Sequence, residues 1–243
     1  MTIIKAIPYL FMAASLYSQA AIQPDRTRII FNSDDKASSL KLENQSKRQP
    51  YLAYSWIEDE KGTKNEDYFV ALPPIQRLEP AALSQVRIVK QAKASALPTD
   101  RESLFYFNVR EIPPVPENSG NNAIVQMAVQ SRLKMFWRPA ALKKKPGAEV
   151  EHSITAQQQG SSLLIHNPTG YYITLAYFGK DDKSVFPGYS STMISPFAST
   201  TLNAGSYTGT AFSLGYMDDY GGLRMLNVRC QGQCTLSVPE PKK

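Results

Sequence analysis

Short runs of alternating apolar and polar residues, broken by Gly, Pro, Asn and Asp, recur along the whole chain. Such runs predict β-strands, because side chains two positions apart share one face of a strand. No long stretch keeps the period of a helix. Strands and turn signals at this spacing favour an all-β protein built of antiparallel sandwiches. The predicted strands are residues 27–31, 39–43, 51–57, 84–89, 104–112, 123–137, 162–167, 173–178, 199–202, 208–216, 224–229 and 235–238.

The longest of these strands covers residues 123–137, where β-forming residues dominate and neither Gly nor Pro intervenes. One parity carries Val125, Met127 and Val129, which places three apolar side chains in a row on one face. The other parity is polar and basic and includes Lys134. Such a strand packs into its own core or is offered to the sheet of another protein. The pattern alone favours the first alternative.

The first 20 residues predict a secretory signal peptide. They contain a basic residue, an apolar run over residues 7–17, and Ser18 and Ala20 at the −3 and −1 positions of a cleavage site, leaving Ala21 as the first mature residue. The apolar run is too short for a spanning helix; a buried or amphipathic N-terminal segment is the alternative. No later segment is apolar enough to cross a bilayer, so we expect a soluble mature protein outside the cytoplasm, without membrane insertion.

Two cysteines, Cys230 and Cys234, lie close together near the C-terminus. In an oxidising compartment such a pair predicts a disulfide that pins a turn. A metal half-site and a redox pair are the alternatives. Two thiols do not complete a zinc site, and thioredoxin-like redox motifs use a spacing of two residues rather than three.

The formal charge is +6, and it falls to +5 when the signal peptide and its one lysine are removed. A basic balance suits anionic partners, nucleic acid included. An exported protein rarely meets nucleic acid, however, so we expect no nucleic-acid partner. The basic residues are scattered apart from a run at 143–145, which we interpret as part of a linker.

The mature chain of about 220 residues suggests two domains, although a single all-β domain can also reach this length. A segment with two prolines and a charge run, residues 138–147, is the best candidate for their boundary. We therefore predict a signal peptide at 1–20, one domain at 21–140 and a second at 141–243.

Candidate catalytic or metal-binding residues are scarce. His152 and His166 lie apart in sequence and are interpreted as surface or turn residues, and no nucleophile elbow, zinc-protease motif or P-loop is present. Residues 218–222 lack the spaced oxygen ligands of a calcium loop and predict a hairpin turn instead. We expect no enzyme activity, no metal and no cofactor.

Several short segments stand out in their order and spacing: residues 25–28 (DRTR), 50–53 (PYLA), 73–80 (PPIQRLEP), 101–108 (RESLFYFN), 110–114 (REIPP), 134–141 (KMFWRPAA), 167–169 (NPT) and 219–222 (DYGG). Each is weak alone, but together they span the mature chain and end at the cysteine pair. In this combination they resemble the PapD-like periplasmic pilus chaperones of Gram-negative bacteria.

The resemblance implies two immunoglobulin-like β-sandwich domains set at an angle, with a cleft between them. It implies a chaperone that holds pilus subunits in the periplasm and passes them to an outer-membrane usher without ATP. Self-association of the free protein, which would mask its subunit-binding strand, remains an alternative that the sequence does not decide.

The resemblance also implies three sets of site residues. A basic pair, Arg28 and Lys134, would bind the C-terminal carboxylate of the subunit. The strand donated to the subunit would present Val125, Met127 and Val129. An ionic cluster between the domains would contain Glu102, Arg138 and Asp219.

Mild departures from the family pattern occur. Met127 stands where a branched aliphatic residue is usual, and Trp137 replaces a commoner Tyr. The connection between Pro114 and Ala123 is short, as in the short-loop subclass that serves rod-forming pili. The alternative function is a secreted β-sandwich adhesion or fibre component, which would enter surface polymers rather than stay soluble. A β-sandwich hydrolase would need a clustered site, for which the sequence offers no candidate.

Overall fold

The structure, a computed structural model, describes residues 20–115 and 126–240. The predicted signal peptide up to residue 19, Val125 and most of the connection between Pro114 and Ala123 therefore lie outside the described residues. The predictions that concern them, including the short-loop subclass, stay predictions.

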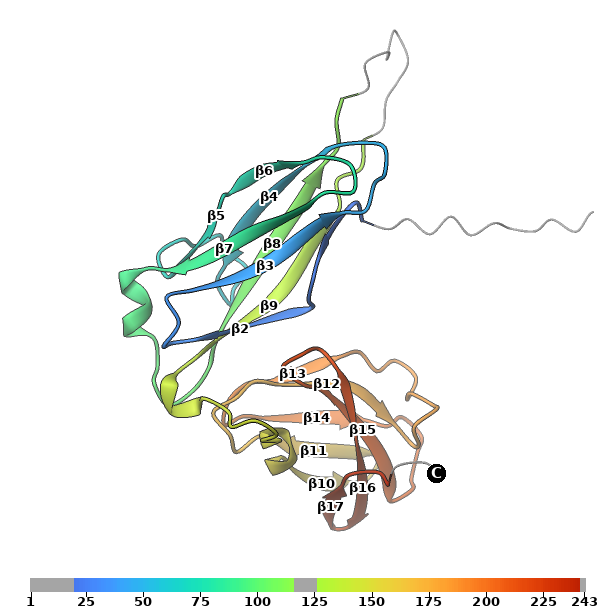
Figure 1. Cartoon of the computed structure of the whole chain (residues 1–243). Coiled ribbons are helices and arrows are strands. Elements are labelled where there is room, and N and C mark those ends of the chain that lie inside the picture. The colour runs from blue at the N-terminus through green and yellow to red at the C-terminus, as the bar shows by residue number, and fades with distance from the viewer. Residues whose placement is uncertain (1–19, 116–125, 241–243) are drawn as a thin grey trace, which may run out of the picture.

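The first half of the chain forms a sandwich of two sheets around one hydrophobic core (Figure 1). Alternation explains the packing: Ile29 and Phe31 are buried in the core, whereas the residues on either side of them face outward. One sheet has the order β1 (Ile22–Pro24), β3 (Ala37–Asn44), β7 (Leu83–Lys90), β5 (Phe69–Leu72). The other has the order β2 (Arg28–Asn32), β9 (Gln130–Arg138), β8 (Ser103–Ile112), β4 (Tyr51–Glu58), β6 (Ile75–Leu78), and a short 3-10 helix, η1 (Ala92–Ala96), follows β7.

The N-terminal segment changes sheets, and this leaves part of β9 exposed at an edge. β1 pairs with β3 in the first sheet, and β2 then crosses to pair in parallel with β9 in the second. The pairing with β2 covers only Lys134 to Arg138, whereas the pairing with β8 extends back to Gln130. Within the described chain, Gln130 to Leu133 consequently have a partner strand on one side only.

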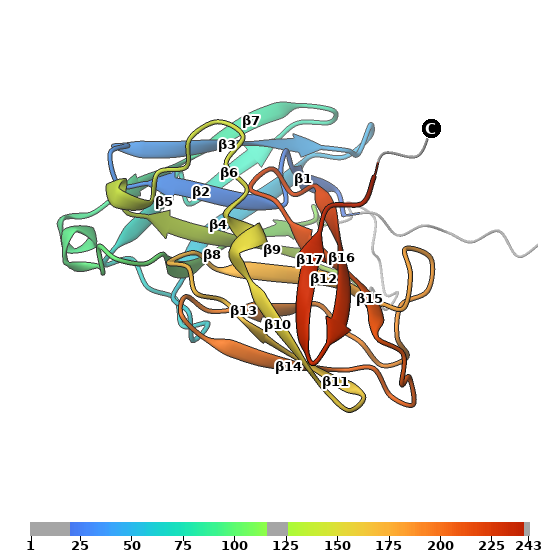
Figure 2. The same ribbon diagram turned by 90° about the horizontal axis from the view of Figure 1, so that it is seen from below.

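The second half of the chain forms one eight-stranded antiparallel sheet folded around a separate hydrophobic core (Figure 2). Leu163, Ile165, Leu175 and Leu214 are among its fully buried side chains. The strand order is β13 (Thr192–Ile194), β12 (Ile173–Gly179), β15 (Ala211–Met217), β16 (Leu223–Gln231), β17 (Gln233–Ser237), β10 (Thr155–Gln159), β11 (Ser162–His166), β14 (Ser199–Asn203).

The prediction of one long strand over residues 123–137 is wrong in its first part, because β9 begins at Gln130 and residues 126–129 are not in a strand. The neighbouring strand explains the difference. β8 ends at Ile112 and is followed by Pro113 and Pro114, which have no amide hydrogen to extend the ladder. Among the described residues, the last backbone bond between these two segments runs from the Glu111 amide to the Val129 carbonyl, at 3.0 Å.

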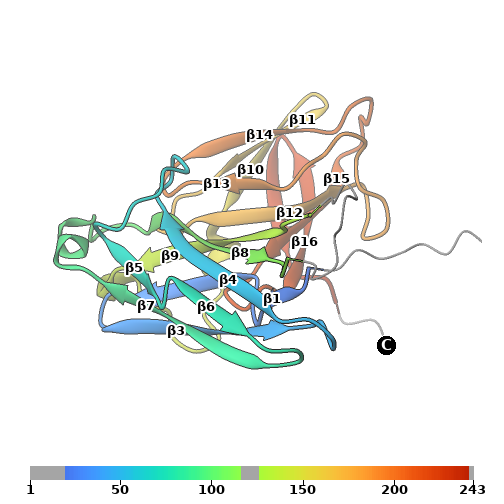
Figure 3. The same cartoon turned by 90° about the horizontal axis from the view of Figure 1, so that it is seen from above.

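The two domains are joined on one side by a segment that contains the 3-10 helices η2 (Ala140–Leu142) and η3 (Val150–Ser153). In Figure 1, β2 and β9 lie on the side of the first domain that faces the second. Seen from above in Figure 3, the first domain lies in front of the second. The last strand of the first domain ends at Arg138 and the first of the second begins at Thr155, so the predicted boundary falls between them. No helix among the described residues is long and apolar enough to cross a membrane.

Candidate functional site between the domains

Two cations lie side by side where β2 and β9 face the second domain. Arg28 and Lys134 are directly opposite each other in the parallel ladder. The guanidinium of Arg28 donates one bond, from Nη1 to the carbonyl of Met217 at 3.2 Å, while its Nε is buried without a partner among the described residues. No side chain of the described residues bonds to the ammonium of Lys134. The pair therefore offers free donors to an incoming anion.

Burial and mutual repulsion disfavour the charges of this pair. Burial lowers the pKa of Arg28, although Asp219 and other nearby carboxylates act in the opposite direction. Burial also lowers the pKa of Lys134, and the positive charge of Arg28 adds to the effect. A bound carboxylate would relieve both penalties through charge-assisted hydrogen bonds.

A cavity of about 800 Å³ opens beside Arg28 between the domains. Its walls come from β2 and the segment before it, from the linker around Lys144, and from the turn between β15 and β16 that contains Asp219. Each wall contributes charged side chains. The cleft expected between the domains is thus present, with Arg28 on its surface.

The three residues expected to form an ionic cluster meet at the domain interface. Arg138 Nε bonds to Glu102 Oε1 at 2.7 Å, and its Nη1 and Nη2 bond to the two carboxylate oxygens of Asp219 at 2.6 and 2.9 Å. Arg138 and Glu102 are almost fully buried. Burial raises the pKa of Glu102 although Arg138 lies beside it. Burial acts in the same direction on Asp219, but the bonds to Arg138 outweigh it and lower the pKa of that carboxyl.

Sequence reasoning missed Lys144, because the basic run at 143–145 resembles a solvated linker. The Lys144 ammonium bonds to Glu151 at 2.7 Å and to Asp219 at 3.2 Å, and its side chain is largely buried. The Tyr171 ring lies 5.2 Å from the charges of both Arg138 and Lys144, and its hydroxyl donates to the Leu142 carbonyl at 2.6 Å. The cluster thus also ties the linker to the second domain.

Two further contacts join the domains on either side of this cluster. The Tyr172 amide donates to Glu102 Oε2 at 2.8 Å, and the Tyr172 hydroxyl donates to Glu60 at 3.3 Å. On the other side, Gly221 in the turn between β15 and β16 has a φ of 84°, and a Cβ there would collide with the Thr27 hydroxyl. Glycine is required here both by the backbone conformation and by the close approach of the first domain.

Met127 and Val129, the two described residues of the predicted donor row, lie just before the unpaired edge of β9. Met127 is 71% exposed, so its side chain does not pack into the core of its own domain. Val129 is half-buried. Along the strand the same parity continues into Leu133 and Met135, which do belong to the core. In the sequence, the core-facing parity of β9 thus continues through Val129 to Met127, which its own sandwich leaves exposed.

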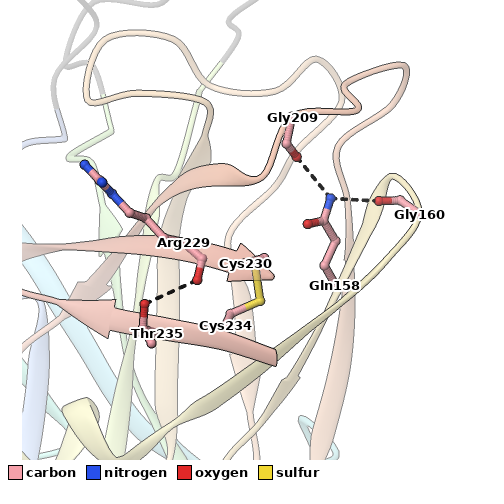
Figure 4. Close-up of a disulfide and its surroundings, with 7 residues drawn as sticks. All are labelled: Gln158, Gly160, Gly209, Arg229, Cys230, Cys234 and Thr235. Atoms are coloured by element: carbon pink, nitrogen blue, oxygen red, sulfur yellow. Dashed lines mark hydrogen bonds between the residues drawn. A yellow bond between two sulfur atoms is a disulfide. The ribbon is translucent and has the colours of Figure 1, made fainter. Parts of the chain in front are cut away.

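The disulfide lies in another part of the molecule. Cys230 and Cys234 face each other across the hairpin of β16 and β17 and are joined by a bond of 2.05 Å, which confirms the predicted pairing (Figure 4). Gly232 at the tip has a φ of 89°. Beside the bond, Thr235 donates to the Arg229 carbonyl. The bond pins the end of the hairpin that points away from the first domain (Figure 1).

The remaining candidate residues have structural partners. His152 bonds to the Tyr216 hydroxyl at 3.0 Å and lies 3.3 Å from a carboxylate oxygen of Glu149, and His166 bonds to Ser199. Residues 218–222 form the tight turn predicted for them, with the Asp218 carboxylate accepting two backbone amides. Among the described residues, no cluster of three His, Cys, Asp or Glu side chains could hold a metal ion.

The fold and this site define a class of protein: two all-β immunoglobulin-like domains at an angle, with a cleft between them that is lined by charged side chains of both signs. Two family models match the chain. Residues 21–143 match the N-terminal domain, and residues 149–228 the C-terminal domain, of the pili-assembly chaperone PapD.

Individual relatives agree with this match. The chain is 57% identical to the uncharacterized fimbrial chaperone YbgP of Escherichia coli K12, over the full length of both, and 38% identical to the chaperone protein PapD of Escherichia coli, covering 95% and 94% of the two chains. Among solved structures, the SafB chaperone in its complex with the SafA pilin of Salmonella enterica superposes with a TM-score of 0.74 at 26% identity, covering 87% of this chain and 97% of that one.

The chain therefore belongs to the family of pilus-assembly chaperones. This family consists of chaperones, which are not a class of enzyme. The fold class and the family expected from the sequence are both confirmed.

Proposed function

We propose that this protein binds pilus subunits in the periplasm by completing their fold with its own strand, while Arg28 and Lys134 hold the subunit's C-terminal carboxylate. The observation that carries the proposal is the adjacency of two features on β9. The strand has an unpaired edge at Gln130 to Leu133, and the free cation pair begins at the next residue.

The unpaired edge suits a subunit that lacks a strand. A sandwich without its last strand exposes an apolar groove and a row of unsatisfied backbone groups, which together favour aggregation. An added strand corrects both faults, because its backbone extends the sheet and its alternate side chains fill the groove. Val125, Met127 and Val129 have the spacing for this role. Burying three such side chains contributes roughly 5–9 kcal/mol before ordering costs are subtracted.

The cation pair would supply what the apolar row lacks. Sliding a strand by two residues restores the same face, so the row alone does not fix the register. A terminal carboxylate occurs once in a chain, and two cations with free donors bind it strongly. Arg28 offers a planar fork and Lys134 a compact charge. Together they would position the subunit, while the row supplies the buried area.

Export and delivery complete the proposal. The first 20 residues would direct secretion and be removed, leaving Ala21 as the first residue of the periplasmic protein. Delivery would be to an outer-membrane usher, as the resemblance to the family implies. The domain division at 140/141 agrees with the separate cores and is part of the same proposal.

Co-expression with pilus subunits tests the function. Each subunit is exported alone, with this chain, or with this chain carrying Arg28→Ala together with Lys134→Ala, and soluble periplasmic subunit is quantified. We expect a subunit that is soluble and co-purifies only with the unaltered chain. A subunit lacking its C-terminal residues should lose most of this protection. Solubility independent of the chain for every subunit tried, or equal capture by the double variant, would contradict the proposal.

A further inference from the structure

One buried carboxylate of the first domain has no cationic partner among the described residues. Glu111 is 6% exposed and lies on the inward face of β8. It is close to Val129, the last residue of the proposed donor segment, residues 125–129. Its Oε2 accepts the backbone amide of Ile22 at 3.0 Å. Within the described chain, no Lys, Arg or His forms an ion pair with Glu111. A buried carboxylate with a single neutral donor is costly unless a positive charge accompanies it.

The backbone next to this carboxylate is the predicted mature N-terminus. Ala21 immediately precedes Ile22, and its carbonyl accepts the amide of Gln45 at 2.7 Å. Ile22 itself is buried in the core. The carbonyl of Ala21 and the residue that follows it are thus both fixed. Only three bonds separate the nitrogen of Ala21 from that of Ile22, which places the two nitrogens about 3–4 Å apart. The nitrogen of Ala21 therefore lies within about 7 Å of Glu111 Oε2.

We infer that Glu111 is the binding site for the α-ammonium group that signal-peptide removal creates on Ala21. The inference rests on the proposed export of this chain and adds a role that the export itself does not require. Hydrolysis of the Ala20–Ala21 bond by a signal peptidase consumes one water, leaving a carboxylate on Ala20 and an ammonium on Ala21. Before cleavage the same nitrogen is a neutral amide. Cleavage therefore places a positive charge next to the buried carboxylate.

The ion pair between Glu111 and the Ala21 ammonium group would also affect the donor segment, because the backbone of Glu111 is bonded to that segment. The Glu111 amide donates to the Val129 carbonyl at 3.0 Å, the last backbone bond before the donor segment leaves β8. Glu111 thus joins the first mature residues to the base of the donated strand. Removal of the signal peptide would thus add an ion pair at the end of the first domain from which the donor segment starts. The uncleaved precursor would lack this ion pair.

A double-mutant cycle on the mature protein tests the inference. The chain beginning at Ala21 is compared with the same chain acetylated at the Ala21 nitrogen, which restores a neutral amide without lengthening the protein. Both forms are made with Glu111 and with Glu111→Gln, and the equilibrium constant for unfolding in urea is measured. We expect acetylation to raise this constant about tenfold with Glu111 and less than about twofold with Glu111→Gln. Equal effects in both backgrounds would overturn the inference.

Two controls keep the result interpretable. Glu43→Gln, on an exposed position of β3, should respond to acetylation as the unaltered chain does. If Glu111→Gln does not fold, amide hydrogen exchange at Ile22 and Glu111 in the unaltered chain replaces the cycle. Exchange should be faster in the acetylated form, and equal rates would overturn the inference.

Failure of this inference is separable from failure of the proposed function. Intact mass of the periplasmic protein reports where cleavage occurs, and a start other than Ala21 would overturn the inference. Subunit capture, measured on the same preparations, reports chaperone function independently of both.

Discussion

Arg28 and Lys134 lie directly opposite each other on the parallel strands β2 and β9, and no carboxylate of the described chain forms an ion pair with either. They lie side by side and half-buried, and each disfavours the charge of the other, so an anion bound between them would be stabilised. The unpaired edge of β9 begins one residue away. The proposed function depends on this neighbourhood of a strand edge and a cation pair.

The planar guanidinium of Arg28 should contribute to carboxylate binding beyond its positive charge. Arg28→Lys keeps the positive charge but loses the planar pair of donors, so we expect weaker subunit capture than in the unaltered chain and stronger capture than with Arg28→Ala. Loss of a bond to a carboxylate corresponds to about 1.5–3 kcal/mol of binding free energy. Affinity for a peptide with the subunit's C-terminal sequence, measured by calorimetry, checks this. Arg26→Ala, which removes an exposed arginine paired with Asp25, is the control, and equal affinities for all forms would contradict the assignment.

Removing the charge of Lys134 should stabilise the free protein while abolishing function. Because the folded state lowers the pKa of Lys134, the unfolded chain binds more protons, and the stability of the free protein rises as the pH approaches the ordinary lysine range. Lys134→Met should therefore be more stable than the unaltered chain at pH 7, by up to about 1 kcal/mol. The difference should shrink towards pH 10.

Urea unfolding at a series of pH values measures this effect. Lys41→Met, an exposed position on β3, should show no comparable gain. A Lys134→Met protein that is less stable than the unaltered chain at pH 7 would contradict the account of the free cation pair.

The ionic cluster should hold the angle between the domains. Arg138→Ala leaves Glu102 buried without its partner and should cost about 3–5 kcal/mol of stability. It also removes both bonds to Asp219, so we expect a changed small-angle scattering profile as well as a lower yield. Arg77→Ala, which breaks an exposed pair within the first domain, should change neither.

Acid should have the same effect on the cluster. The folded state lowers the pKa of Asp219 below its ordinary value of 3.8, so its contribution is complete above about pH 4 and is lost as the pH falls through the lowered value. The part of the scattering change that is due to Asp219 should therefore appear only below about pH 4. A change at higher pH would instead report protonation of Glu102, whose pKa burial raises.

Met127 should be needed for subunit binding but not for folding. Its side chain is 71% exposed, so Met127→Asp should change the free energy of unfolding by less than about 0.5 kcal/mol. A charge inserted into the apolar groove of a subunit should reduce capture at least tenfold. Leu83→Asp is a matched control, because Leu83 is 67% exposed on the opposite sheet. Co-purification of subunit with both variants at normal levels would contradict the donor role.

The sequence predicted most of the strands and the correct family, because alternation and turn residues are local signals. It predicted a strand that begins too early, before Gln130. The pairing of β9 with β8 stops there because β8 is followed by two prolines, a feature of the neighbouring strand and not of the predicted one. The pairing of Arg28 with Lys134 was predicted only from the family resemblance, because the two residues lie far apart in the sequence. Lys144 was missed because its partners, Glu151 and Asp219, come from other segments.

Glu111 illustrates the same limit. In sequence it is one acidic residue among charged and apolar neighbours, and nothing local shows that its side chain is buried against the backbone of Ile22. Only the crossing of the N-terminal segment from β1 to β2 brings these parts together.

Amide hydrogen exchange on β9 tests the central claim most directly. In the free protein, alternate amides between Gln130 and Leu133 point to the unpaired edge and should exchange rapidly, whereas those bonded to β8 are protected. In the complex with a pilus subunit, the edge-facing amides should become protected by at least tenfold. Unchanged exchange at these amides in a stable complex would show that the subunit binds elsewhere and would contradict donation of this strand.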